Sequence, residues 1–130
     1  MFRKLMRAVF FLGVIAGTVT VSATEVASNA RVNGDGIVEA FKRDDWAAIE
    51  TRFDAKMKQA APHEKFVAMM GAIRQKFGAL KNCAEPTVQQ AGGITVFDYP
   101  CEFAQSRQTL RLAFNADATL GGLFFTPPKP

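Results

Sequence analysis

Histidine is almost absent from this sequence of 130 residues, in which His63 is the single example. Serine is nearly as scarce: beyond the N-terminal stretch only Ser28 and Ser106 occur, and no serine lies in a G-x-S-x-G pentapeptide. A nucleophilic serine needs a histidine base that a third residue orients. The scarcity of both residue types therefore excludes a self-contained serine hydrolase.

Metal-binding and phosphate-binding patterns are also missing. The two cysteines lie far apart, and neither a C-x-x-C nor an H-E-x-x-H motif is present. The glycines of Gly34-Asp35-Gly36 are not followed by the lysine and serine of a P-loop. We therefore expect neither a metal nor another cofactor.

The N-terminal stretch, residues 1–23, has the pattern of an export signal peptide. Three basic residues precede a short apolar core, Ala8–Gly17, and small residues lead to a cleavage site after Ala23. The core is short for a bilayer span, so an uncleaved membrane anchor is the alternative. We expect a secreted or periplasmic protein without a membrane segment once the leader is removed. A second possible cut after Ala30 leaves the mature start open.

A strong net charge is lacking once the leader is set aside. The whole chain carries a formal net charge of +4, from 16 basic and 12 acidic residues. Three of the bases and none of the acids lie in the leader, which leaves 13 against 12, a net charge of +1. Because nucleic-acid binding depends on neutralising many phosphates, we expect no nucleic-acid partner.

Helical spacing dominates the first half of the remaining chain. Residues 24–35 are small, polar and glycine-rich and predict a flexible lead-in. Three helices are expected next: one capped by Asp35, one capped by Asp44 or Asp45, and one opened by Pro62 and ended by Gly78. Their apolar stripes contain Ile37, Val38, Phe41, Trp46, Ile49, Phe53, Met57, Phe66, Ile73 and Phe77.

The second half changes to the two-residue period of strands. Four strands are expected over residues 87–90, 94–103, 109–114 and 120–125, with a three-residue hairpin loop at Ala91-Gly92-Gly93. Three helices followed by a four-stranded antiparallel meander predict a single α+β domain over residues 36–128.

The hairpin predicts a disulfide. With that loop, Gln90 pairs with Ile94, and every facing pair has residue numbers that sum to 184. Cys83 and Cys101 share this sum and would face each other, as a disulfide across two strands requires. Two buried free thiols, or a reactive pair of Cys101 and His63, are the alternatives.

The sequence resembles a family of exported domains of unknown function, DUF3887. The shared marks are F-D-x-x-M-K at 53–58, a proline-opened third helix and G-L-F-F-x-P at 122–127. The resemblance extends from about Gly36 to Pro128 and implies a nuclear-transport-factor-2-like or cystatin-like cone fold. It implies no established reaction. Family members often precede a hydrolase domain, whereas this sequence ends at Pro130, so no hydrolase activity is assigned to these residues.

A cone fold implies a pocket between helices and sheet. Our candidate lining residues are Trp46, Phe53, Phe66, Phe97 and Tyr99. Some proteins of this fold class place an aspartate and a tyrosine together for proton transfer, but Asp98 and Tyr99 are neighbours on one strand and point to opposite faces. A buried Asp98 or Glu102 could act as a base. The main expectation is a solvated carboxylate.

The two adjacent phenylalanines near the C-terminus indicate an association surface. Phe124 and Phe125 lie on opposite faces of the last expected strand, and only one face has helices to cover it. We expect the other face to pair with a second copy or with a separate exported partner such as a hydrolase, unless the lead-in and the tail cover it. The expected function is thus a non-catalytic binding or accessory module. A small isomerase-like or hydrolase-like enzyme is the alternative.

Overall fold

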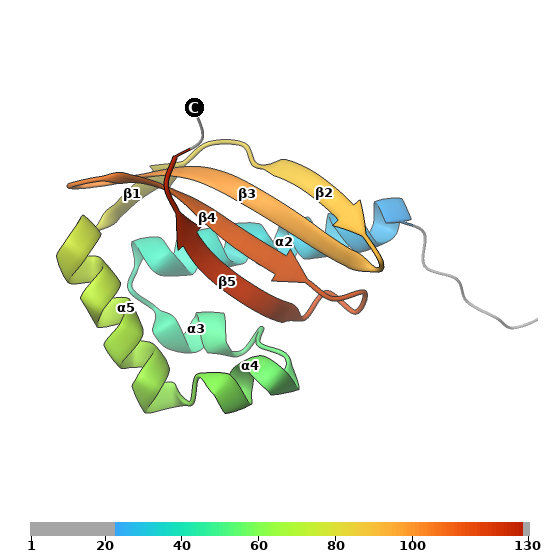
Figure 1. Cartoon of the computed structure of the whole chain (residues 1–130), viewed down its shortest axis with the longest axis horizontal. Helices are drawn as coiled ribbons and strands as arrows, with labels where there is room; N and C mark the ends of the chain where they lie inside the picture. The colour runs from blue at the N-terminus through green and yellow to red at the C-terminus, as the bar shows by residue number, and fades with distance from the viewer. Residues whose placement is uncertain (1–22, 129–130) are drawn as a thin grey trace, which may run out of the picture.

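A computed structural model describes residues 23–128 and shows an α+β domain in which N-terminal helices pack on an antiparallel sheet (Figure 1). The sheet has five strands rather than four, because a short additional strand also pairs with the long central strand. The helices are α2 (Ala23–Lys42), α3 (Trp46–Glu50), α4 (Ala55–Ala60) and α5 (His63–Phe77). The strands are β1 (Leu80–Cys83), β2 (Thr87–Ala91), β3 (Ile94–Phe103), β4 (Arg107–Phe114) and β5 (Leu120–Thr126).

Helix α2 corrects the expectation of a flexible lead-in. Residues 24–35 are helical, and Asp35 lies inside the helix rather than at its cap. Glycine within a helix costs about 1 kcal/mol relative to alanine, which is why the sequence suggested a loop. Two close approaches favour glycine here: a Cβ at Gly34 would lie 2.5 Å from the hydroxyl of the buried Tyr99, and one at Gly36 would lie 2.6 Å from a terminal nitrogen of Arg52. Tertiary packing therefore overrides local propensity.

The expected second helix is divided into α3 and α4. Asp45 caps α3 by accepting a hydrogen bond from the Ala48 amide, and Asp54 caps α4 in the same way. Between them, Phe53 forms a parallel bridge with Leu120 at the start of β5. The helix is interrupted here because the backbone of Phe53 pairs with the sheet at this one residue.

The hairpin is one residue tighter than expected. Gly92 and Gly93 form a two-residue turn with φ of 58° and 82°, and Ala91 faces Ile94. Both positive φ values are those that a two-residue hairpin favours, and glycine adopts them without strain. The facing pairs of β2 and β3 consequently sum to 185, not 184.

Despite this change of register, a bulge between β1 and β2 brings Cys83 opposite Cys101. Thr87 faces Asp98 and Cys83 faces Cys101. Between these two pairs lie three residues, 84–86, on one side and only two, 99–100, in β3. Cys83 and Cys101 form a disulfide, with their Cα atoms 4.0 Å apart. The disulfide prediction is confirmed although the loop register behind it was wrong. The alternatives of free thiols and of a reactive Cys101–His63 pair are wrong.

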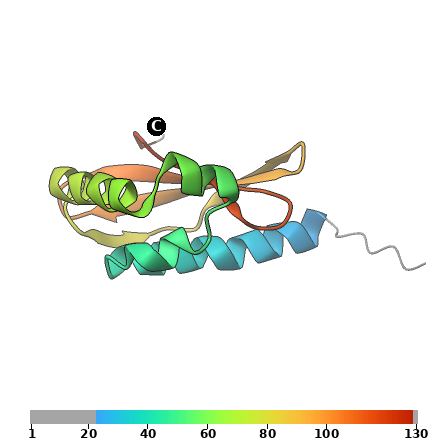
Figure 2. The same ribbon diagram turned by 90° about the horizontal axis from the view of Figure 1, so that it is seen from below.

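The sheet has one face covered by α2 and an opposite face over whose centre no helix of residues 23–128 lies, with α4 at its border. In Figure 1 α2 runs behind the sheet, and Figure 2 shows α2 on one side while the described residues that follow β5 leave on the other. Phe125 points to the covered side, where its ring lies 5.7 Å from that of Phe41 and 6.2 Å from that of Phe77. Aromatic contacts of this kind stabilise a core beyond the area they bury. We call the other side the outer face; its central residues are Val96, Asp98, Thr109, Arg111, Ala113, Gly122 and Phe124.

Candidate functional site

Phe124 dominates the outer face. It is 53% exposed and lies in β5 directly beside Arg111 of β4, which in turn faces Asp98 of β3. Its ring lies over Gly122, where an added Cβ would approach the ring to 2.8 Å. The ring therefore rests against the sheet on one side, and about half of the side chain stays exposed. The sequence predicted that one of the two phenylalanines would face outward, and the structure selects Phe124.

Asp98 is buried on this face, although none of the described helices covers it. Both its carboxylate oxygens accept hydrogen bonds from Arg111, at 2.7 and 2.9 Å. These bonds raise the pKa of the Arg111 guanidinium. A two-pronged pairing holds both side chains in one plane beside Phe124. Asp98 is thus the carboxylate of an ion pair rather than an available base, and Glu102 further along β3 is exposed.

Two hollows border the outer face. One, of about 420 Å³, lies where α4 meets the sheet and is lined by Asp54, Lys56 and Ala113 among others. The second, of about 370 Å³, is lined by Asp98, Pro100, Thr109 and the C-terminal Pro128. Pro128, the last described residue, therefore reaches one corner of the outer face, and Phe124 stays exposed.

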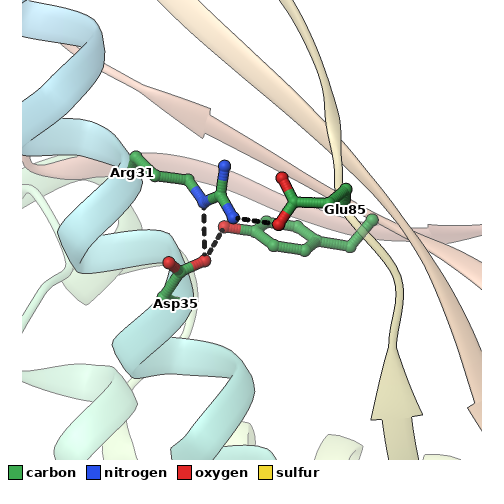
Figure 3. A network of polar contacts seen from close by, with 4 residues as sticks. Arg31, Asp35 and Glu85 are labelled. Atoms are coloured by element: carbon green, nitrogen blue, oxygen red, sulfur yellow. Dashed lines mark hydrogen bonds and ion pairs between the residues drawn. The ribbon is translucent and has the colours of Figure 1, made fainter.

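A polar network lies on the covered side of the sheet, between α2 and the bulge (Figure 3). The Tyr99 hydroxyl donates to Asp35 at 2.9 Å, and Arg31 donates to Asp35 at 2.8 Å and to Glu85 at 3.0 Å. Burial and the bond to Asp35 raise the pKa of the Tyr99 phenol. The phenol therefore stays protonated, and its hydrogen bond to Asp35 links β3 to α2.

The sequence correctly separated Asp98 from Tyr99 but missed the partner of Tyr99. Asp35 was expected to cap a helix that starts there. The pattern Gly34-Asp35-Gly36 contained the clue, because two small residues beside an acid allow another segment to approach the helix closely. No local rule names the residue that approaches.

The five candidate pocket residues all contribute to the core cluster or pack against it. Phe53, Phe66, Phe97 and Tyr99 are buried, and Trp46 is partly buried. The rings of Phe53 and Phe66 lie 5.0 Å apart, and those of Phe97 and Tyr99 lie 6.1 Å apart. Phe97 and Tyr99 also reach two separate surface hollows. These aromatics stabilise the packing between helices and sheet.

Other site classes have little support in residues 23–128. This part of the chain contains no group of three or more histidine, cysteine or acidic side chains that could hold a metal ion. None of its helices is long and apolar enough to cross a bilayer. His63 is exposed, and its Nδ1 lies 2.7 Å from a carboxylate oxygen of Glu50. The expected leader lies almost entirely outside the described residues.

The disulfide and the family relationship complete the description. Cys83–Cys101 is typical of proteins in an oxidising compartment. Comparisons with curated proteins and with solved structures find no match. Residues 35–123 match the family described as "Protein of unknown function (DUF3887)", a span that begins in α2 and ends in β5. The chain therefore belongs to the DUF3887 family.

Proposed function

We propose that this chain is an exported, non-catalytic binding module that associates with a second copy of itself through the outer face. The proposal includes a cone of the nuclear-transport-factor-2-like type, with α2 and the shorter helices filling the space that some cones keep open. The observation that carries the proposal is the 53% exposure of Phe124 on a sheet face that no helix within residues 23–128 covers. An exposed aromatic ring beside a fixed ion pair is typical of an interface centre.

The charges of the outer face support a second copy as the occupant. Asp98 faces Arg111 and Glu102 faces Arg107, so acids and bases balance across β3 and β4. A surface with balanced charges meets its own copy without net repulsion, and a two-fold axis lets each base approach an acid of the other copy. Apolar Val96 and Ala113, both partly buried, extend the contact surface next to Phe124.

The enzyme alternative has less support. A carboxylate base needs an apolar pocket and a second polar group that converges on the substrate. Asp98 is occupied by Arg111, Glu102 is exposed, and Asp35, which does meet Tyr99, also accepts a hydrogen bond from Arg31. Each carboxylate that could act as a base is thus either paired or solvated.

Changing Phe124 to Glu should abolish the dimer, because two carboxylates would meet near the two-fold axis in place of two rings. The measurement is sedimentation velocity over a range of protein concentrations. The matched control is Val32→Glu, which replaces another exposed apolar side chain, 71% exposed, on α2 away from the outer face. We expect this control to retain the dimer.

A wild-type protein that stays monomeric at all concentrations would contradict the proposal. So would a dimer that survives Phe124→Glu. The circular dichroism spectrum of the variant should match that of the wild type, because the substitution changes an exposed side chain. If it does not, Phe124→Ser, which adds no charge, provides the same comparison.

We also propose that the leader is removed near Ala23 on export. The charge pattern of residues 1–23 and the disulfide of the folded domain both support this. Intact mass spectrometry of exported protein should find a mature start at residue 24 or, with the second site, at residue 31. A mass that includes residues 1–23 would show that the leader is retained as an anchor.

A further inference from the structure

The second hollow of the outer face contains two proline rings. It has a volume of about 370 Å³, and Ala84 and Thr87 line it on the side of the bulge. Pro100 of β3 and Pro128, the last described residue, are the prolines in its lining. Aromatic side chains pack on proline rings in many peptide complexes. The size and the lining of the hollow are therefore suited to an aromatic ring.

The bulge explains why β3, a central strand, contains Pro100. Proline lacks the amide hydrogen that a strand donates to its neighbour. In an antiparallel pair the amide and the carbonyl of one residue point to the same neighbour, and the Pro100 carbonyl accepts from the Ala84 amide at 2.8 Å. The missing donor therefore points to the bulge, residues 84–86, where the ladder is already interrupted.

The charges that line the hollow are balanced within the chain. Glu102 faces Arg107 across β3 and β4, and Asp98 is bonded to Arg111. A neutral ring can enter such a hollow without leaving one of these charges buried and unpaired.

Phe124 is the raised apolar group of the same face. Its ring rests over Gly122, which has no side chain, and Gly122 faces Ala113, which has only a methyl group. The ring does not line the hollow, because β5 is separated from β3 by β4. The outer face thus presents a projecting ring and, at another position, a recess of matching chemistry.

The strand register defines a two-fold axis that exchanges these two positions. Phe124, Arg111 and Asp98 form a row across β5, β4 and β3, and Pro100 lies two residues beyond Asp98. From the usual spacings of strands and residues, Phe124 and Pro100 are about 12 Å apart. Two identical sheet faces meet around an axis that lies between them and parallel to both. The axis that exchanges Phe124 with Pro100 crosses the row between Arg111 and Asp98.

The same axis brings opposite charges together. It places Arg111 of each copy over Asp98 of the other, so four charges alternate in sign at the centre of the contact. The two hydrogen bonds within each copy, at 2.7 and 2.9 Å, hold these side chains in position. One register therefore matches ring to hollow and base to acid, which favours a second copy as the occupant.

We infer that Phe124 of each copy packs into the hollow of the other copy, against Pro100 and Pro128. The inference rests on the proposed dimer and adds the position that receives the ring. The contact occurs twice, and the two rings lie close to the two-fold axis on either side of it. The hollow is thus a binding subsite for an aromatic side chain of a second copy.

Nuclear Overhauser effects between copies test the contact directly. A mixture of carbon-13-labelled and unlabelled wild-type protein, recorded with isotope filters, should show contacts from the Phe124 ring to Pro100 and Thr87 of the other copy. Contacts between two Phe124 rings, with none to Pro100, would overturn the inference and leave the proposed dimer intact. A monomeric wild-type protein would contradict both.

Thr87→Glu should weaken the dimer by roughly tenfold or more, because it places a carboxylate in the hollow that the ring must enter. Sedimentation velocity measures the effect. The matched control is Gln89→Glu, which adds the same charge at the next outer-face residue of β2, outside the hollow. Both residues are exposed, and the control should dimerise as the wild type does. If Thr87→Glu does not fold, Thr87→Tyr fills the hollow with the chain's own ring and should also weaken the dimer.

A mixture of Phe124→Ser and Thr87→Glu gives the result most specific to this arrangement. The first variant lacks the ring and keeps the hollow, and the second keeps the ring. Each variant alone loses both contacts, whereas a mixed pair retains one, so the heterodimer should be stronger than either homodimer. Absence of this heterodimer, or a Thr87→Glu variant that dimerises like the wild type while Phe124→Glu does not, would overturn the inference alone.

Discussion

Reduction of the Cys83–Cys101 disulfide is expected to lower the free energy of unfolding by about 3 kcal/mol, the chain-entropy value for a loop of this size. The two cysteines are separated by 18 residues, and the bond closes the bulge and the β2–β3 hairpin into one loop. For a domain of this length the melting temperature should fall by roughly 10 to 20 °C. Denaturant titration with and without reductant measures the difference without changing any side chain.

The double variant Cys83→Ala/Cys101→Ala provides the control for the disulfide. It should be as unstable as the reduced wild type and should not respond to the reductant. A loss below about 1 kcal/mol on reduction would show that the unfolded chain gains little freedom from the cleavage. A thiol titration of the unreduced, denatured protein should find no free cysteine, in agreement with the bonded pair.

Changing Gly34 to Ala is expected to destabilise the domain by about 2 kcal/mol, within the usual range for overpacking a core. The new Cβ would lie 2.5 Å from the Tyr99 hydroxyl, which is held in place because Tyr99 is buried and bonded to Asp35. Alanine would otherwise favour the helix by up to about 1 kcal/mol. The clash is thus expected to reverse the sign that helix propensity predicts.

The Tyr99→Phe background distinguishes the clash from a general intolerance of α2. Without the hydroxyl, the nearest ring atom to the new Cβ is Cζ at 3.4 Å, an ordinary contact. Gly34→Ala should then be neutral or slightly stabilising, and the difference between the two backgrounds gives the coupling energy. Gly71→Ala in α5 is the matched control, because nothing lies within 4 Å of its Cβ. Equal effects of Gly34→Ala in both backgrounds would contradict this account of the contact.

Local rules were sufficient for the fold class and for most elements. The change from helical to strand period after Gly78 predicted the α+β order, and Gly78 does end α5, with φ of 84°. The alternation in β5 predicted that Phe124 and Phe125 would separate. These features follow from residue type and spacing alone, because a strand alternates its side chains and a helix repeats every three or four residues.

Long-range contacts decided the features that sequence reasoning missed. Gly34 and Gly36 predicted a loop because glycine weakens an isolated helix. Only the close approach of Tyr99 and Arg52 explains why glycines occur in α2. Phe53 was expected inside a continuous helix, but in the structure its backbone pairs with Leu120. In each case the deciding partner lies at least 16 residues away, in another element of the domain.

The sequence by itself determined the helix-then-strand order, the lack of a serine nucleophile and the division of Phe124 from Phe125, because these depend on composition and local period. Only the tertiary structure decided that Phe124 is the outward residue, that Arg111 occupies Asp98, and that a bulge brings Cys83 opposite Cys101. The reason is that the covered face of a sheet depends on where the helices pack, and that packing is set by contacts between segments far apart in the chain.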